Sequence, residues 1–360
     1  MRRLLLAIVT ASMLTYAQSP VRLAIAGLNH GHVSGFLHNA ARRTADIQIV
    51  GIYDPDAALV AKYGKSSQFP ANAQFTDLAK MLDTVKPDAV AIFSDTGSHA
   101  SLVEKIAPHK IPIMMEKPLA VDNQQAHAIQ AAAARYGVPV IVNYETTWYP
   151  TTGEIGKLLH DQKAAGEIRR MVALTGHQGP KEINVQPEFF AWLSDPVKNG
   201  AGALFDFGCY GANIMTWLMD NQRPLKVTAI AQTEKPQIYP HVDDDATIVL
   251  QYPKAQGVIE ASWNWPINRK DFEAYGASGY AIATGGNSLR VKMTNDKTES
   301  TVTPPERQPV DRDSISYLVA VTRGQIKPSG LSSLENNVIV TEILSAARES
   351  VKTGRTVTLQ

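Results

Sequence analysis

The strongest constraint on the fold is an alternation of strand-like and helix-like segments in the first part of the chain. Short apolar runs typical of buried strands occur at 21–26, 47–53, 88–93, 111–115 and 138–142. Segments in which apolar residues recur at helical spacing separate these runs. Strands that alternate with helices assemble into right-handed β-α-β units, so we expect a doubly wound parallel sheet of the α/β class here.

The pattern changes after about residue 143. Strand-like runs then follow one another, and several alternate apolar and polar residues as one-sided antiparallel strands do, at 168–175, 226–233, 246–252, 256–263, 269–276 and 280–284. Helical patterns and one last strand are expected at 151–164, up to Leu218, 313–323, 333–352 and 356–359. A chain of 360 residues suggests two domains, which we place at 20–143 and 144–360.

The turn between the first strand and the first helix is a degenerate dinucleotide-binding motif. The usual spacing is G-x-G-x-x-G, and here only Gly27 fits, with Asn29 and His32 at the second and third positions and Gly31 out of phase. Asn29 can still adopt unusual backbone angles, and the helix start offers amide N–H groups to a pyrophosphate. We therefore expect Gly27, Asn29, His30 and Gly31 to lie at a cofactor.

Asp54 ends the second predicted strand, where a carboxylate can accept hydrogen bonds from ribose hydroxyls. A carboxylate there repels a 2′-phosphate, and no arginine follows it, so the sequence favours NAD over NADP. The alternative interpretation of Asp54-Pro55-Asp56 is a simple turn that caps a helix.

His30 and His32 have a spacing that could suggest a metal site. No carboxylate lies at a suitable offset in the sequence near them, so we expect no metal. We expect these histidines to form hydrogen bonds near the cofactor or substrate instead.

Glu116-Lys117-Pro118 follows the fourth predicted strand. The carboxyl end of such a strand lies at the usual ligand crevice of an open parallel sheet. In the second half, Asp206 and Tyr210 are four residues apart at a glycine-rich helix start, so both can face one side. A lysine at this place can contact a hydroxyl, a cofactor amide or a developing alkoxide, so Lys117 is a candidate catalytic residue. Asp206 could orient or polarise a hydroxyl, and Tyr210 could pass a proton. A nearby ammonium such as Lys117 would lower the pKa of Tyr210.

Composition limits the classes of function. Lysine and arginine number 35 against 34 acidic residues, and a formal net charge of +1 argues against a nucleic-acid-binding surface. Cys209 is the single cysteine, so an intrachain disulfide and a cysteine zinc site are both excluded by number.

The N-terminus has the pattern of an export signal. Arg2 and Arg3 precede an apolar stretch over 4–14 that is too short to span a bilayer stably, and Thr15-Tyr16-Ala17 supplies small residues before a cleavage point. We predict that residues 1–17 are a signal peptide and that the mature protein is periplasmic or extracellular, without a membrane segment. A retained anchor is the alternative, and the choice between general and twin-arginine export stays open.

Together these features resemble the Gfo/Idh/MocA oxidoreductases, named for glucose–fructose oxidoreductase, inositol dehydrogenase and a rhizopine-catabolism protein. The resemblance covers nearly everything after the signal peptide. It rests on the turn at Gly27, Asp54, the Ser94-to-His99 segment, Glu116-Lys117-Pro118, Gly202 through Tyr210 and the ending Ser350 to Val357.

The resemblance implies a Rossmann domain followed by a domain with a large open sheet, which often serves oligomerisation, so we expect a homodimer or homotetramer. It also implies cofactor contacts at Ser94, His99, Glu116 and Lys117. By the same resemblance, Lys117 would contact the reacting hydroxyl, Asp206 would assist, and Tyr210 would stand where many members carry a histidine base. Glucose–fructose oxidoreductase and the dimeric dihydrodiol dehydrogenases are similar in using a tyrosine there. A carbohydrate substrate would contact His177 and Trp148, and Trp192, Trp263 and Trp265 could also stack on sugar rings.

An exported enzyme finds little free NAD, so it needs a cofactor that stays bound and is regenerated in each cycle. One chemistry that fits is oxidation of one sugar and reduction of another. An NAD-dependent glycosidase, which oxidises, eliminates, hydrates and reduces in turn, is the alternative. A non-catalytic protein that binds sugars or a partner on the same scaffold is a third possibility.

Overall fold

The computed structural model describes residues 19–359. The predicted signal peptide lies outside these residues. Among the residues that are described, no helix is both long enough and apolar enough to cross a membrane.

The first half of the chain forms the predicted parallel sheet. Six strands pair in the order β3-β2-β1-β4-β5-β6, and every pair is parallel. The strands are β1 (Val21–Ala26), β2 (Ile47–Tyr53), β3 (Gln74–Phe75), β4 (Ala89–Ile92), β5 (Ile113–Glu116) and β6 (Val140–Asn143). The helices between them are α1 (Val33–Ala41), α2 (Ala57–Ser66), α3 (Leu78–Val85), α4 (His99–Ile106) and α5 (Asn123–Tyr136). Strand order changes direction at β1 and β4, which creates the crevice at their carboxyl ends where ligands bind in such sheets.

The second half contributes a nine-stranded sheet in the order β14-β13-β12-β11-β7-β10-β9-β8-β15. Among the described strands of this sheet, only the pair β7 and β10 is parallel, so the sheet is mostly antiparallel, as expected. The strands are β7 (Ile168–Gly176), β8 (Lys226–Gln232), β9 (Asp245–Gln251), β10 (Gln256–Ser262), β11 (Arg269–Gly276), β12 (Gly279–Thr284), β13 (Ser288–Met293), β14 (Ser300–Val302) and β15 (Val357–Thr358). Strands β13 and β14, at one end of this sheet, were not predicted. Strand β14 has only three residues, whereas β13 alternates polar and apolar residues and could have been recognised from that pattern.

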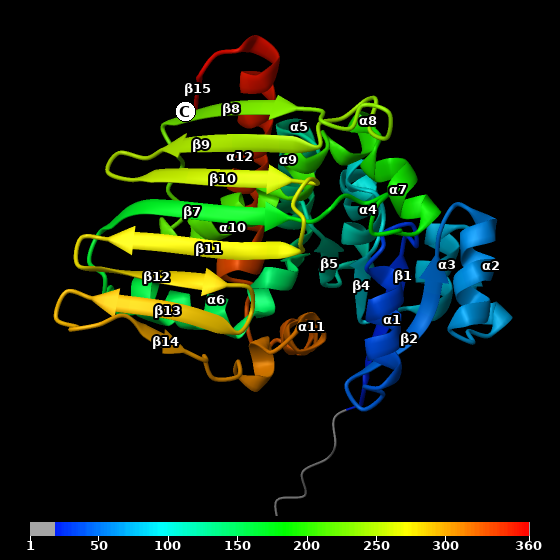
Figure 1. Ribbon diagram of the computed structural model, residues 1–360. Helices are drawn as coiled ribbons and strands as arrows, with labels where there is room; N and C mark the ends of the chain where they lie inside the picture. The colour runs from blue at the N-terminus through cyan, green and yellow to red at the C-terminus, as the bar shows by residue number, and fades with distance from the viewer. Residues whose placement is uncertain (1–18, 360) are drawn as a thin grey trace, which may run out of the picture.

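Helices cover one face of this large sheet and leave the other face open (Figure 1). The covering helices include α9 (Ala203–Asp206), α10 (Gly208–Leu218) and α12 (Leu334–Thr353). Strand β8 shows the consequence, since Val227 and Ala229 are buried towards α12 while Ile230 is 71% exposed. One-sided burial of this kind produces the period-2 pattern seen in the sequence.

The two halves are joined by more than the chain connection. Helix α11 (Ser314–Thr322) belongs to the C-terminal part, yet Leu318 and Val319 pack into the core beneath the parallel sheet. Arg43 donates hydrogen bonds to both carboxylate oxygens of Asp313 at 2.6 and 2.8 Å. Two short helices that the sequence did not predict, α7 (Pro187–Leu193) and α8 (Pro196–Asn199), lie between the large sheet and the parallel sheet (Figure 1).

Candidate active site

Lys117 emerges directly after β5, at the crevice of the parallel sheet, and it is buried. Its ammonium donates to the Asp206 carboxylate at 2.5 Å and to the Asp206 main-chain carbonyl at 2.9 Å. Burial alone would lower the pKa of Lys117, but the Asp206 charge raises it above its usual value. Lys117 is therefore charged at neutral pH. Two of its three N–H donors are committed to Asp206, and one is left for a ligand.

Asp206 ends α9 and is held on both carboxylate oxygens. One oxygen pairs with Lys117, and the other accepts the indole N–H of Trp263 at 3.0 Å. Burial would raise the pKa of Asp206, but the Lys117 charge lowers it, so the carboxylate is ionised. The turn before α9 is fixed because the Asp243 carboxylate accepts the main-chain N–H groups of Gly202 and Leu204 at 2.8 and 2.7 Å.

Tyr210 lies in the first turn of α10, beside Lys117. The Lys117 Nζ atom is 5.0 Å from the centre of the Tyr210 ring. The expectation that this ammonium lowers the pKa of Tyr210 is wrong. Burial raises that pKa well above its usual value, and the carboxylates of Glu145 and Asp206 raise it further, because both disfavour a phenolate. Tyr210 is therefore a protonated phenol in this state.

Lys117, Asp206 and Tyr210 line one cavity of about 420 Å³ between the parallel sheet and the large sheet. His177, which the sequence suggested as a substrate contact, also lines this cavity, and burial lowers the pKa of His177 to about 4. The His177 Nδ1 atom accepts the Gly179 main-chain N–H at 2.9 Å. The neutral ring therefore carries its proton on Nε2 and can donate to a ligand oxygen.

Lys270 is a residue of this cavity that the sequence did not single out. Its ammonium lies 5.5 Å from the centre of the Tyr210 ring and 2.8 Å from a carboxylate oxygen of Glu145. Lysine is common in exposed strands, so Lys270 at the start of β11 gave no signal in the sequence. Only the pairing of β11 with β7 brings it next to α10.

The glycine turn has the geometry that a dinucleotide site requires. Gly27 has φ of +87°, and a β-carbon there would lie 2.7 Å from the main-chain nitrogen of Ser94. Only glycine fits this close approach. Ser94 is buried, and its hydroxyl donates to the Asp95 carbonyl at 3.0 Å. The main-chain oxygen of Asn29 accepts the indole N–H of Trp192, on α7, at 3.0 Å.

Glu116, His30 and His32 form a cluster that the sequence argument missed. One ligand atom from each of them lies within 4.8 Å of the others. The lack of a carboxylate near the two histidines in the sequence did not show which carboxylates are near them in space, because Glu116 lies at the end of β5. His32 Nδ1 is 3.0 Å from one Glu116 oxygen, and Asn143 donates to the other at 2.7 Å.

The state of His30 bears on what this cluster can hold. Its Nδ1 atom accepts the main-chain N–H of His32 at 3.2 Å, so the proton of the neutral ring is on Nε2. Burial keeps the pKa of His30 well below its usual value. A histidine that ligates a metal usually donates from its other nitrogen. His30 does the reverse, so it offers a hydrogen-bond donor more readily than a metal ligand.

The His30 Nε2 atom is buried and has no hydrogen-bond partner among the described residues. A buried donor without a partner is costly, and an oxygen of a bound dinucleotide beside the glycine turn would satisfy it. The turn and the start of α1 therefore fit a dinucleotide. Gly31 lies under the ring of Phe189, which closes this part of the crevice.

Asp54 and His99 have structural partners. The Asp54 carboxylate accepts the main-chain N–H groups of Leu28 at 2.7 Å and Asp56 at 2.9 Å, which holds the glycine turn against β2. His99 is fully buried at the start of α4, and its Nδ1 atom is 3.1 Å from the Leu119 carbonyl oxygen. Each carboxylate oxygen of Asp54 has a second lone pair, so a ribose contact is compatible with these bonds.

Two of the tryptophans that the sequence suggested for stacking on sugar rings are packed inside the protein. Trp263 and Trp192 are buried and bond to Asp206 and Asn29, as described above. Trp148 does not line the cavity of Lys117. Its indole N–H donates to Asn143 at 2.9 Å, and its ring lines a separate cavity.

Comparison with known proteins agrees with this architecture. Residues 21–144 match the model of an oxidoreductase family with an NAD-binding Rossmann fold, and residues 156–282 match the GFO/IDH/MocA C-terminal domain. An inositol dehydrogenase homologue of Azotobacter vinelandii, solved with NAD+, superposes with a TM-score of 0.79 at 17% identity over 95% of this chain and 98% of its own. The aldose-aldose oxidoreductase of Caulobacter crescentus gives 0.78 at 19% identity over 94% of this chain and 100% of its own. At these identities the two structures show a shared fold.

Three of the curated relatives are named as dehydrogenases. The D-apiose dehydrogenase of Paraburkholderia graminis is 25% identical over 87% of this chain and 83% of its own length. The scyllo-inositol 2-dehydrogenase (NADP(+)) of Bacillus subtilis is 22% identical over 92% and 97%. The trans-1,2-dihydrobenzene-1,2-diol dehydrogenase of Xenopus tropicalis is 26% identical, and the match spans 61% of that relative's length. Taken with the fold and the two family matches, these relatives show that the chain belongs to the Gfo/Idh/MocA family of oxidoreductases.

Proposed function

We propose that the protein is an NAD-dependent oxidoreductase that acts on a CH–OH group of a sugar or sugar derivative. The observation that carries this proposal is the convergence of Lys117, Asp206 and Tyr210 on one cavity beside the glycine turn. Sugar and polyol dehydrogenases among the relatives support the substrate class.

Lys117 holds the reacting oxygen. Asp206 fixes the ammonium through two hydrogen bonds, so the remaining N–H keeps a defined direction without an ordering cost during the reaction. A fixed positive charge stabilises the negative charge that develops on the substrate oxygen as its proton leaves. Asp206 acts through Lys117 and is a positioning residue.

Tyr210 transfers the proton. As a protonated phenol it is ready to donate to a carbonyl oxygen, which is the direction of reduction. In the direction of oxidation, Tyr210 has to be a phenolate so that it can accept the proton of the substrate hydroxyl. A positive charge bound beside Tyr210 would lower the tyrosine pKa and so favour the phenolate. His177 donates from Nε2 and orients a neighbouring hydroxyl.

NAD supplies the hydride acceptor when bound. The residues that would hold it are the Gly27 turn with Asn29, His30 and Gly31, together with Asp54, Ser94 and Glu116. Asp54 lies near the carboxylates of Asp56 and Asp95, and this concentration of negative charge disfavours a 2′-phosphate. We therefore propose NAD, although the Bacillus subtilis relative is named for NADP.

We further propose that the protein is exported and that its cofactor stays bound through each cycle. The signal-like residues 1–17 support export. Packing of Phe189 on Gly31 and the bond from Trp192 to Asn29 support retention, because α7 covers the glycine turn. The purified protein should release NAD when it is denatured. A protein that releases no NAD and binds none on titration would favour a non-catalytic sugar- or partner-binding role.

Substrate assays separate the remaining chemistries. An aldose is incubated with a ketose or with a second aldose, without added NAD. If the bound cofactor is recycled, one sugar of the pair should be oxidised and the other reduced. Aryl α- and β-glycosides under the same conditions test the glycosidase alternative, which predicts release of the aryl alcohol. Lys117→Ala should abolish either activity, and near-normal turnover in that variant would overturn the catalytic assignment.

A homo-oligomer is also proposed, with the open face of the large sheet as the interface. Ile230 and Val249 are 71% and 39% exposed on β8 and β9. Exposed apolar side chains in neighbouring strands are typical of interaction surfaces.

A further inference from the structure

A second cavity, larger than the candidate active site, lies where helix α6 (Pro150–Ile155) meets the end of α10. Its volume is about 570 Å³, within the range of small-molecule sites. None of the described residues lines both this cavity and the one that contains Lys117. The proposed reaction makes no use of it.

Aromatic side chains form part of its wall. Trp148, Trp217 and Tyr317 all line it. His160 stacks on Trp217 with ring centres 5.4 Å apart and planes at 16°. The Trp217 ring packs directly against Gly156, where a β-carbon would lie only 2.2 Å from the ring. An amphipathic ring of this kind suits a ligand that is apolar on one side and polar on the other.

Two ion pairs lie in the wall of the cavity. Lys157 lies 3.1 Å from the Glu154 carboxylate, and Arg307 lies 2.6 Å from that of Asp311. The lining carboxylates of Glu154, Asp161, Glu306 and Asp311 outnumber these two cations, which disfavours an anionic ligand such as a phosphate or a sugar acid. A neutral ligand fits this surface better, because it leaves both ion pairs intact.

Unsatisfied oxygens lie among the lining residues. Thr147 Oγ1, Ser332 Oγ and one carboxylate oxygen of Asp311 are buried and have no hydrogen-bond partner among the described residues. Buried polar atoms in native proteins normally have a partner. A small rotation of either hydroxyl, or a bridging water, would let a polyhydroxylated ligand satisfy them.

We propose that this cavity is a second carbohydrate site, which binds a neutral sugar of one or two rings. The C–H face of a pyranose would pack on the aromatic wall, and its hydroxyls would bond with the oxygens at the floor and with the exposed edges of the ion pairs. The inference goes beyond the proposed function and does not depend on turnover.

Saturation-transfer NMR with D-glucose, D-galactose, cellobiose and maltose, without added NAD, tests the proposal. Gln308 is an exposed residue at this cavity, so Gln308→Trp should fill it and raise the Kd of the binding sugar at least about tenfold. Turnover at the Lys117 cavity should not change. Gln325→Trp, on the exposed turn after α11, is the matched control and should bind as the wild type does.

Trp217→Phe provides a second variant, since it keeps most of the apolar bulk and shortens the platform. Trp217→Phe should raise the Kd of the same sugar. For Gln308→Trp, an unchanged melting temperature shows that the variant is folded. The proposal is overturned if none of the four sugars binds the wild type. It is equally overturned if a sugar binds wild type and Gln308→Trp alike, because the signal then comes from another site, including the Lys117 cavity.

Discussion

At the scale of single residues, the Lys117–Asp206 pair combines a structural and a chemical role. Both side chains are buried, and each charge holds the pKa of the other in the direction that keeps both ionised. A buried pair of this kind contributes little net stability, but removal of one partner leaves an uncompensated charge. Loss of activity in a single variant therefore has to be separated from loss of stability.

We predict that Lys117→Met lowers the free energy of unfolding by about 3–5 kcal/mol, because the Asp206 charge then stays buried without a partner. The double variant Lys117→Met, Asp206→Asn should recover part of that stability, since the asparagine side chain is neutral and can still accept from Trp263. Both variants should lack turnover. Denaturant unfolding and activity measured in parallel check this, and a double variant that regains turnover would contradict the assignment of Lys117.

The same pair sets a pH window for stability. The Asp206 pKa is lowered, so its contribution is present above the usual carboxylate range and is lost as the pH falls through the lowered value. The Lys117 pKa is raised, so its contribution is present below the usual lysine range and is lost as the pH rises through the raised value.

Tyr210 gives a second prediction about pH. Since burial raises the pKa of Tyr210 well above the usual tyrosine value, the oxidation rate should rise with pH across the neutral range. Reduction should be favoured at neutral pH, where Tyr210 carries its proton. Tyr210→Phe should lower both rates by about 10²–10⁴-fold and remove this pH dependence. A variant with an unchanged pH profile would show that another group transfers the proton.

At the scale of elements, α7 connects the C-terminal part to the cofactor crevice. Glu188 pairs with Lys62 of α2 at 2.5 Å, and Trp192 donates to Asn29 in the glycine turn. These contacts join α7 to α2 and to the glycine turn. The sequence did not predict this helix, because its seven residues are too few for a clear helical period.

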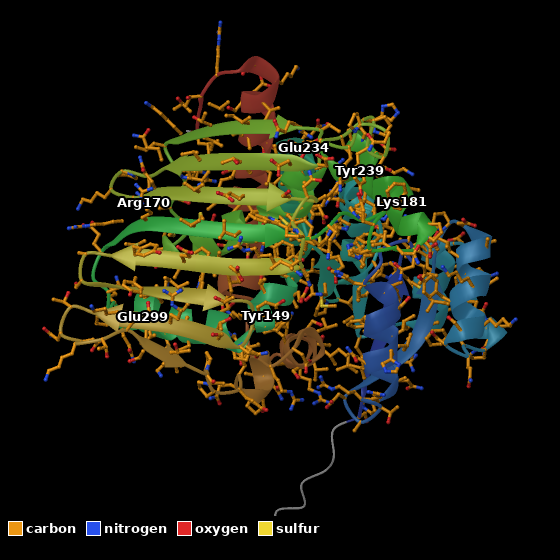
Figure 2. All side chains as sticks on the ribbon, in the orientation of Figure 1. Tyr149, Arg170, Lys181, Glu234, Tyr239 and Glu299 are labelled. Carbon is orange, nitrogen blue, oxygen red and sulfur yellow. The ribbon has the colours of Figure 1, made fainter. Side chains whose placement is uncertain are left out.

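If α7 retains the cofactor, Trp192→Phe should increase the rate of NAD release roughly two- to tenfold, the effect of one net hydrogen bond. Glu188→Gln should have a smaller effect, because Lys62 is half exposed and water screens the pair. Glu299→Gln is the control: it removes a similar ion pair with Arg290, at the far edge of the large sheet (Figure 2). NAD retained after gel filtration measures the outcome, and equal retention in the wild type and all three variants would exclude α7 as a cover.

Element boundaries show how far local sequence signals reach. Strands β1, β2 and β11 begin and end at the predicted residues. Asp122 caps α5 and accepts the Gln125 main-chain N–H at 2.8 Å. The reciprocal bond of a capping box is absent, since the Gln125 side-chain oxygen has no partner among the described residues. The cap depends on a single side chain close in the sequence. The reciprocal bond also requires the Gln125 side chain to turn back to the Asp122 main-chain N–H.

At the scale of the whole molecule, the large sheet presents an open face with apolar side chains on neighbouring strands (Figure 1). We predict that the wild type is a dimer or tetramer in solution and that Ile230→Lys shifts it towards the monomer. Val351→Lys, on the exposed side of α12, is the matched control and should keep the assembly. Light scattering after gel filtration gives the mass, and a monomeric wild type would contradict the proposed interface.

Several features of this protein were determined by the sequence alone. Period-2 and helical patterns predicted the parallel sheet and most of the antiparallel sheet, because burial of one face or both imposes these periods locally. Short motifs predicted Gly27, Lys117, Asp206 and Tyr210, because a sharp turn and a strand end restrict which residues fit there. The family followed from those motifs in their order.

Only the tertiary structure decided the electrostatics and the second cavity. Burial and the Glu145 carboxylate set the pKa of Tyr210 against the expected direction, and both depend on residues far away in the sequence. Glu116 reached His30 and His32, and Lys270 reached Tyr210, through strand pairing that no local pattern encodes. Trp148 turned towards a different cavity for the same reason. Charge interactions and cavities depend on distances in space, which the chain fixes only once it has folded.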